Sequence, residues 1–139
     1  AELTDAFEGK LRGSITDQIA ESLDRYQVDV IEVIGHTDEQ PISRPTSNLD
    51  QSIIDVVDGR KPVTAITPAD NAGLGMARAL AVVNVLKSED KLKGATILPM
   101  SGAQLVLPGD ELTTGQAGDV ESRRRIEIRI RRRNETTAQ

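Results

Sequence analysis

Residues 28–35 read Val-Asp-Val-Ile-Glu-Val-Ile-Gly and carry the strongest strand signal in the chain. Their β-branched side chains favour an extended backbone. Because few of these positions are polar, we expect a strand that is buried on both faces for much of its length, with Gly35 ending it. Such a strand needs helices and neighbouring strands to cover it, and the flanking sequence supplies both.

Two helical patterns flank this strand. Apolar residues recur at four-residue intervals from Phe7 to Leu23, which predicts a helix over residues 4–25 with Thr4 as its N-cap. The second pattern is expected to begin at Thr67-Pro68, with a capping threonine and proline in the first position, and to end near Lys87.

Two further strands are predicted nearer the end of the chain. Residues 95–100 have the pattern of a short strand, and residues 125–131 alternate charged residues with isoleucine. This period of two is typical of a strand with one buried and one charged face. Residues 101–122, between the two strands, are polar and glycine-rich and are expected to form a loop. The order predicts an α+β fold: a mixed sheet with two main helices packed on it.

Residues 37–70 form a long excursion between the first strand and the second main helix. Prolines and small polar residues predict little regular structure there, apart from a short helix around residues 49–57. Ser47 or Asn48 is expected to open this helix, and Gly59 to stop it.

The length of 139 residues fits a single domain, residues 1–139, with residues 134–139 as a tail. No run approaches the roughly 18 apolar residues of a membrane-spanning helix. Because the chain begins at Ala1 rather than methionine, we expect it to be a fragment of a longer protein, with any membrane anchor upstream.

Composition excludes several classes of function. The only aromatic residues are Phe7 and Tyr26, so modes that stack bases or sugars on aromatic rings are not expected. With no cysteine, there is neither thiol catalysis nor a thiolate metal site. His36 is the single histidine, and at a strand end a structural role is expected for it. No nucleophile motif or phosphate loop is present, so we expect no catalytic residues, no metal, no cofactor and no enzyme activity.

The net charge of −5 hides a cluster of arginines near the end of the chain. A basic end can bind nucleic acid or phosphate. Here the alternation with isoleucine favours a solvated, charged strand face instead, and no nucleic-acid partner is expected. The seven arginines of this cluster are Arg123, Arg124, Arg125, Arg129, Arg131, Arg132 and Arg133.

Charged residues also lie at the ends of the predicted elements. Asp38 follows the buried strand, and Arg78 lies in the first turns of the second main helix. The plain interpretation is a pair of surface charges or a weak mutual salt bridge.

Three ordered motifs suggest a more specific role. They are Ile-Gly-His-Thr-Asp at residues 34–38, Asn-Ala-Gly-Leu-Gly-Met-Ala-Arg-Ala at residues 71–79, and Arg-Arg-Ile-Glu-Ile at residues 124–128. Together they resemble the motifs of OmpA-like peptidoglycan-binding domains, and the resemblance covers roughly residues 1–133. It implies the two-layer OmpA-like sandwich and non-catalytic binding of peptidoglycan.

The ligand that this resemblance implies is the diaminopimelate side chain of the peptidoglycan stem peptide. By similarity, Asp38 would receive its ammonium group and Arg78 would bind its carboxylate with two parallel hydrogen bonds, which lysine cannot copy. Thr37, Asn71 and Leu74 match positions that line or shape the pocket.

The sequence departs from the family pattern at several places. Gly75 stands where the family usually has serine, and Arg123 where it often has asparagine. The excursion over residues 37–70 is longer than in compact members. The strand that precedes the first helix in the family has no counterpart here.

The run His-Thr-Asp-Glu-Gln-Pro-Ile at residues 36–42 is most similar to the MotB group of motor stators and the related ZorB proteins of anti-phage defence. That resemblance implies a periplasmic domain of an inner-membrane protein, a homodimer, and a membrane-embedded ion-channel partner whose complex the domain anchors to the wall. Attachment to the outer membrane is the second possibility for location. A dimerisation or protein-interaction module without wall binding is the alternative function.

Overall fold

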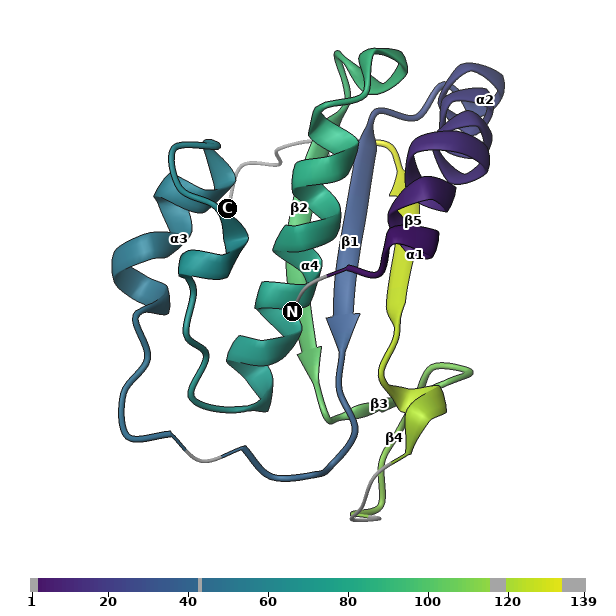
Figure 1. Ribbon diagram of the computed structural model, residues 1–139. Helices are drawn as coiled ribbons and strands as arrows, with labels where there is room; N and C mark the ends of the chain where they lie inside the picture. Colours follow the sequence, from purple (N-terminus) through teal and green to yellow (C-terminus); the bar gives the residue numbers. More distant parts are fainter. Residues whose placement is uncertain (1–2, 43, 116–119, 134–139) are drawn as a thin grey trace, which may run out of the picture.

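The computed structural model describes residues 3–42, 44–115 and 120–133 (Figure 1). The helices and strands, in chain order, are α1 (Asp5–Lys10), a π-helical turn (Leu11–Ile15), α2 (Thr16–Tyr26), β1 (Val30–His36), α3 (Leu49–Val57), α4 (Asn71–Lys87), β2 (Thr96–Ala103), β3 (Val106–Leu107), β4 (Glu111–Leu112) and β5 (Ile126–Arg131). Short 3₁₀ turns lie at Val63–Ala65, Asp90–Leu92 and Glu121–Arg123. The chain therefore has the expected mixed α+β composition.

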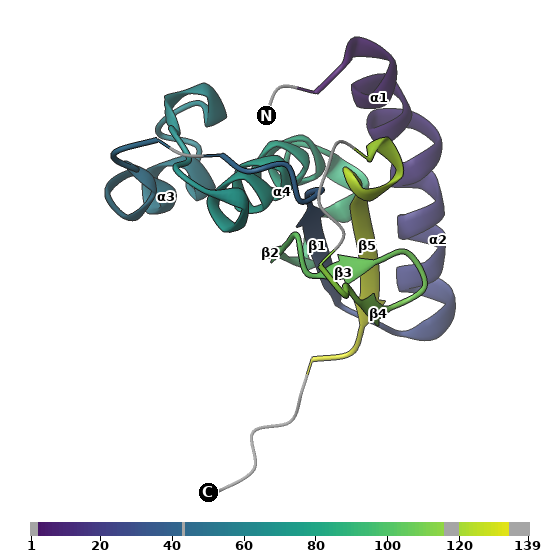
Figure 2. The ribbon, with the colours of Figure 1, turned by 90° about the horizontal axis from the view of Figure 1, so that it is seen from below.

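The main sheet is mixed, with the strand order β2-β1-β5. Strand β1 runs parallel to β2 and antiparallel to β5, so the predicted strand with the strongest signal is the central one. Strands β3 and β4 form a separate antiparallel hairpin. In both views α4 lies between α3 and the N-terminal helix (Figures 1 and 2).

The N-terminal helix covers the predicted range as α1, the π-helical turn and α2 in succession. Its expected cap is confirmed, because the Thr4 hydroxyl accepts a hydrogen bond of 3.1 Å from the backbone N–H of Phe7. The Thr16 hydroxyl donates to the carbonyl of Leu11, five residues earlier, at the wider π-helical turn. Gln27 ends the helix in the left-handed conformation.

The core lies between the helices and one face of the sheet. Helix α4 supplies most of the buried side chains on the helix side, and Ile31 and Val33 of β1 face them. Ile126, Ile128 and Ile130 of β5 pack against the same cluster, which confirms the predicted alternation. Helix α3 packs outside α4 through a second cluster that includes Val56 and Leu80.

Helix α4 begins later than the sequence predicts. Asp70 is its N-cap and accepts a hydrogen bond of 2.8 Å from the N–H of Gly73, so the expected start at Thr67-Pro68 is wrong. The N–H of Thr67 instead donates a hydrogen bond to the side-chain oxygen of Asn48, the residue before α3. A carboxylate caps a helix as well as a hydroxyl does, so local preference does not exclude Asp70 as the cap.

The predicted strand limits also need correction. Strand β1 does not end at Gly35 but continues through His36. Strand β2 runs on to Ala103, so the predicted loop over residues 101–122 begins inside a strand. The β3–β4 hairpin occupies part of the same stretch. Short pairs of this kind carry too few residues for a periodic signal.

Among the described residues, no helix is long and apolar enough to cross a membrane.

Candidate functional site

A small pocket of about 200 Å³ lies where the end of β1 meets the start of α4. All five residues that the sequence singled out line it: Thr37, Asp38, Asn71, Leu74 and Arg78. The rest of the pocket lining comes from residues 40–42 and from Arg124. The fold therefore brings together residues that come from widely separated parts of the chain.

Asp38 is held in a fixed position by the chain around it. Its residue surface is only 4% exposed, and Oδ1 accepts a hydrogen bond of 3.0 Å from the N–H of Gln40. Oδ2 accepts from the N–H of Val120 at 3.1 Å and from Nη1 of Arg124 at 2.5 Å. The neighbouring Thr37 is equally buried, and its N–H donates to the carbonyl of Ala103 at 2.9 Å.

These contacts keep Asp38 ionised. Burial alone raises the pKa of a carboxyl group. Here the hydrogen bonds from Arg124, Gln40 and Val120 outweigh burial, and the pKa of Asp38 lies below its ordinary value. The pocket therefore presents a carboxylate at neutral pH.

Arg78 faces the same pocket from α4. Its Nη1 donates to the carbonyl of His36 at 3.2 Å. Burial and then the positive charge of Arg124 lower the pKa of Arg78. Within the described part of the chain, Arg78 forms no ion pair. A mutual salt bridge with Asp38 is therefore not what the structure contains, since Asp38 pairs with Arg124.

Arg124 is the pocket residue that sequence reasoning missed. It was recognised only as part of the third motif, and its place opposite Asp38 depends on where β5 begins. The available signal was the pair Arg124-Arg125 directly before the alternating strand. Arg125, the next residue, does not line the small pocket and pairs with Glu127 instead.

A buried ion pair supports the loop that carries Asp38. Arg123 has only 4% of its side chain exposed, and its Nη1 lies 3.1 Å from Oε1 of Glu39. The same Glu39 oxygen accepts from the hydroxyl of Thr113. The prediction that this arginine belongs to a solvated face is wrong, because the 3₁₀ turn before β5 directs its side chain inward.

We expect Arg123→Met to lower the denaturant midpoint of unfolding, because Glu39 is left without its cationic partner. Adding Glu39→Leu to Arg123→Met should recover part of the loss, since a hydrophobic pair can replace a buried ion pair. Equilibrium urea unfolding of the single and double variants measures both effects. An unchanged midpoint in Arg123→Met would contradict the proposed support.

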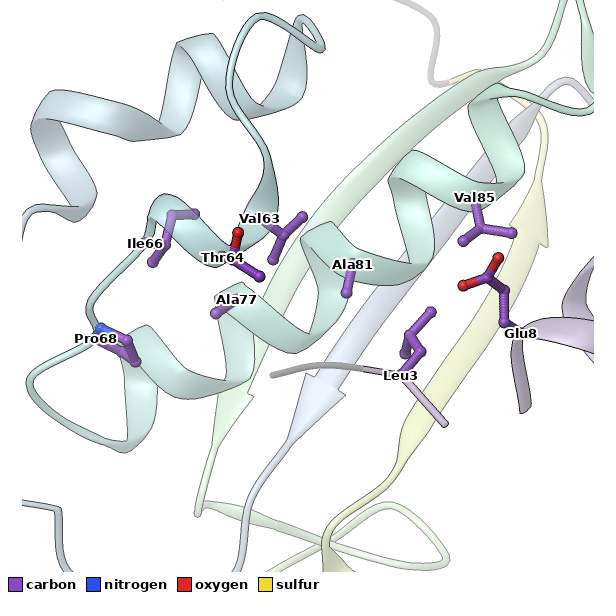
Figure 3. A pocket seen from close by; sticks show the side chains of 9 residues that line it. All are labelled: Leu3, Glu8, Val63, Thr64, Ile66, Pro68, Ala77, Ala81 and Val85. Atoms are coloured by element: carbon purple, nitrogen blue, oxygen red, sulfur yellow. The ribbon is translucent and has the colours of Figure 1, made fainter. Parts of the chain in front are cut away.

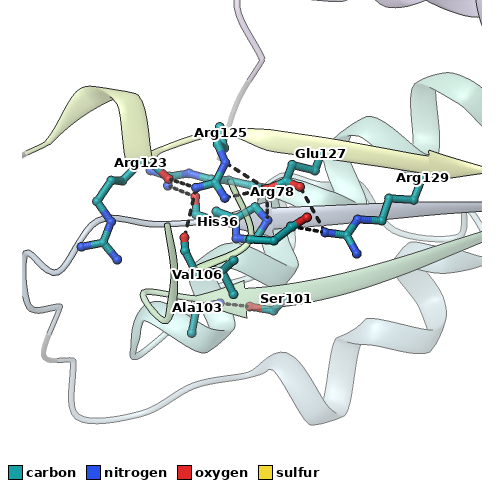
Figure 4. A network of polar contacts seen from close by, with 10 residues as sticks. His36, Arg78, Ser101, Ala103, Val106, Arg123, Arg125, Glu127 and Arg129 are labelled. Atoms are coloured by element: carbon teal, nitrogen blue, oxygen red, sulfur yellow. Dashed lines mark hydrogen bonds and ion pairs between the residues drawn. The ribbon is translucent and has the colours of Figure 1, made fainter. Parts of the chain in front are cut away.

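His36 lies in a polar network behind the pocket (Figure 4). It is 2% exposed, and its Nε2 is 3.0 Å from Oε1 of Glu127. Arg125 donates to that same oxygen from Nε and Nη2. A Cβ on Gly102 would lie 2.5 Å from Nδ1 of His36, so the ring is packed directly against this glycine. The surroundings are those of a structural histidine.

This environment predicts a pH dependence of stability. Burial, and then the charge of Arg125, lower the pKa of His36 below the value of 6.5. His36 therefore binds a proton more tightly in the unfolded chain than in the folded chain. The free energy of unfolding should fall as the pH drops below about 6.5. One proton sets a limit of about 1.4 kcal/mol per pH unit.

Urea unfolding between pH 7.5 and 5.5 measures this slope, with His36→Gln as the comparison. The chain has no other histidine, so the slope should largely disappear in the variant. An equal slope in both proteins would show that another group is responsible.

Gly75 allows the start of α4 to lie close to the sheet. A Cβ there would lie 2.4 Å from the hydroxyl of Ser101 and 2.7 Å from the carbonyl oxygen of Gly35. The hydroxyl of Ser101, on β2, donates to the carbonyl of Ala72 at 2.6 Å. A serine from the sheet thus supplies a hydroxyl at the helix start, where the resembled family has a serine on the helix itself.

A second hollow of about 540 Å³ lies along α4, and residues of the Val63–Ala65 turn and of the N-terminal segment also line it (Figure 3). Its lining is mostly apolar, and its polar side chains are Thr64 and Glu8. It lacks the opposed charges of the small pocket, so it does not suit a zwitterionic ligand. Among the residues that the structure describes, no three His, Cys, Asp or Glu side chains come together as a metal site.

The small pocket offers a carboxylate and guanidinium groups side by side in a largely buried setting. Such a pair can bind a ligand that carries an ammonium and a carboxylate on one carbon. Comparisons with protein-family models, with curated proteins and with solved structures give no match for this chain.

Proposed function

We propose that this chain is an OmpA-like domain that binds the diaminopimelate side chain of peptidoglycan without catalysis. The observation that carries the proposal is the pocket that gathers Thr37, Asp38, Asn71, Leu74 and Arg78. Asp38 would receive the ammonium group, and Arg78 would bind the carboxylate. The volume of about 200 Å³ suits the end of one side chain rather than a whole sugar or peptide.

Arg124 adds a feature to this proposal. In the absence of ligand it neutralises Asp38, so the buried carboxylate is never left without a partner. An incoming ammonium would share Asp38 with Arg124, and the ligand carboxylate would offset the charges of Arg78 and Arg124 together. Because the ligand end carries one positive and one negative group, its binding would leave the net charge of the pocket unchanged.

The wider role follows from the resemblance alone. In this proposal the domain lies in the periplasm, belongs to a MotB-like inner-membrane protein and acts as a homodimer. It would anchor a motor-like unit with an ion-channel partner to the wall. Many equivalent wall sites at high effective concentration would make weak binding by each domain sufficient.

Co-sedimentation with purified sacculi tests the function. We expect the chain to pellet with sacculi that contain diaminopimelate, and to stay in solution with sacculi whose stem peptides carry lysine, which lacks the second carboxylate. Release of soluble wall fragments would indicate an enzyme instead. If the folded chain binds neither kind, the proposal fails, and self-association measured by sedimentation would test the alternative of a dimerisation module.

A further inference from the structure

A larger groove of about 630 Å³ adjoins the small pocket. Arg78 and Arg124 line both of them, so the two spaces share these arginines as part of their walls. The remaining wall comes from the start of the N-terminal helix and the start of β5. The groove is lined by Leu3, Thr4, Phe7, Arg78, Arg124, Arg125 and Ile126.

The lining combines positive charge with apolar surface. Arg78, Arg124 and Arg125 line it, and no acidic residue does. Asp38 and Glu127, the carboxylate partners of Arg124 and Arg125, are not among its lining residues. The apolar lining residues are Phe7, Ile126 and Leu3. Such a groove complements an anionic group that has a small apolar group beside it.

Arg78 is central to this complementarity. Its guanidinium carries five N–H donors in a planar fork, and within the described chain only Nη1 makes a hydrogen bond. One edge of the fork could therefore serve a carboxylate in the small pocket while other donors serve the groove. A second anion would also reduce the repulsion between Arg78 and Arg124.

We infer that the groove is a second carboxylate subsite, which takes the terminal D-alanine of the stem tetrapeptide. This inference rests on the proposed function. D-Alanine follows diaminopimelate in the stem peptide, so it would lie next to the small pocket when the side chain occupies it. Its carboxylate would face the arginines, and its methyl group would contact Phe7.

The test compares two soluble ligands by calorimetry: the stem tetrapeptide with a free D-alanine carboxylate, and the same peptide as its C-terminal amide. These ligands have nearly the same shape and differ only in the terminal group, which is a carboxylate in one and a neutral amide in the other. Since a hydrogen bond to a charged group is stronger than one to a neutral group, we expect the acid to bind at least roughly ten-fold more tightly than the amide.

Thr4 permits a matched pair of variants. Aspartate and asparagine both cap helices well and have the same size, so neither should disturb the N-terminal helix. Thr4→Asp places a negative charge at the groove and should remove the preference for the acid, whereas Thr4→Asn should keep it. Thermal unfolding of both variants controls for folding.

The outcomes separate the two proposals. Equal binding of acid and amide to the unaltered chain would overturn the second subsite while leaving the small pocket as the wall-binding site. An equal preference for the acid in Thr4→Asp and Thr4→Asn would place the carboxylate outside this groove and overturn the inference as well. If neither peptide binds, the proposed function fails and the subsite fails with it.

Discussion

Replacing Arg78 with lysine should reduce binding to sacculi at least ten-fold, although the positive charge is kept. Lysine is a point charge and cannot form the two parallel hydrogen bonds that a planar guanidinium makes with a carboxylate. Losing one charge-assisted hydrogen bond costs about 1.5–3 kcal/mol. Arg78→Ala should cost more, roughly 2–5 kcal/mol, because it also removes one of the two pocket cations, Arg78 and Arg124, that would face the ligand carboxylate.

Asp38→Asn should also reduce binding to sacculi at least ten-fold, as Arg78→Lys does. It removes the charge that, in the proposed function, would face the ammonium group, and it keeps the shape of the side chain. Because Arg124 and two backbone N–H groups contact this carboxylate, the variant should also lose some stability. Urea unfolding measures that loss separately from the co-sedimentation assay.

Arg60→Lys is the matched control for Arg78→Lys. Arg60 follows α3 and is 63% exposed, and its partners Asp55 and Asp58 lie outside the pocket. We expect it to bind sacculi as the unaltered chain does. If Arg78→Lys and Arg60→Lys bind equally well, Arg78 does not recognise a carboxylate in the proposed way.

Gly35→Ala should destabilise the fold by about 3 kcal/mol or more, at or above the top of the range for overpacked cores. A Cβ at this position would lie 2.0 Å from the carbonyl oxygen of Gly75 and 3.1 Å from the backbone nitrogen of Ala79. Both atoms belong to the backbone of α4, so no side chain can rotate out of the way. The helix would have to move away from β1, which would also displace Arg78 from the pocket.

Gly9→Ala is the same chemical change, but we expect it to raise the stability of the fold rather than lower it. Gly9 lies in α1, and apart from its own helix backbone a Cβ there would meet no atom within 4 Å. Alanine should stabilise the helix by roughly 0.5–1 kcal/mol. Thermal and urea unfolding of both variants measure the contrast, and a tolerated Gly35→Ala would contradict the close approach of α4 to β1.

Local patterns predicted most of the elements. The four-residue recurrence before Leu23 and the cap at Thr4 predicted the N-terminal helix, and the alternation over residues 125–131 predicted β5. Each of these signals depends on residues within one element. The boundaries of elements were predicted less well: the start of α4 was expected at Thr67-Pro68, whereas Asp70 is the N-cap, and both residue types cap helices.

The candidate site was predictable as a set of residue types but not as a set of contacts. Five of its lining residues came from motifs in the sequence. The pairing of Asp38 with Arg124 rather than Arg78, and the burial of Arg123, were not predictable. The three adjacent arginines are chemically identical. Only the position of β5 relative to β1 places Arg124 in the pocket, Arg125 beside Glu127 and Arg123 in the interior.

Sequence patterns were sufficient for the mixed α+β class, for the buried strand that is β1, and for the charged residues after β1 and in the first turns of α4. These depend on periodicity and local propensity, which act over a few neighbouring residues. The tertiary structure alone decided which charges meet and how closely α4 approaches the sheet at Gly35. Ion pairs and backbone contacts depend on distances between segments that lie far apart in the chain, and no local pattern encodes those distances.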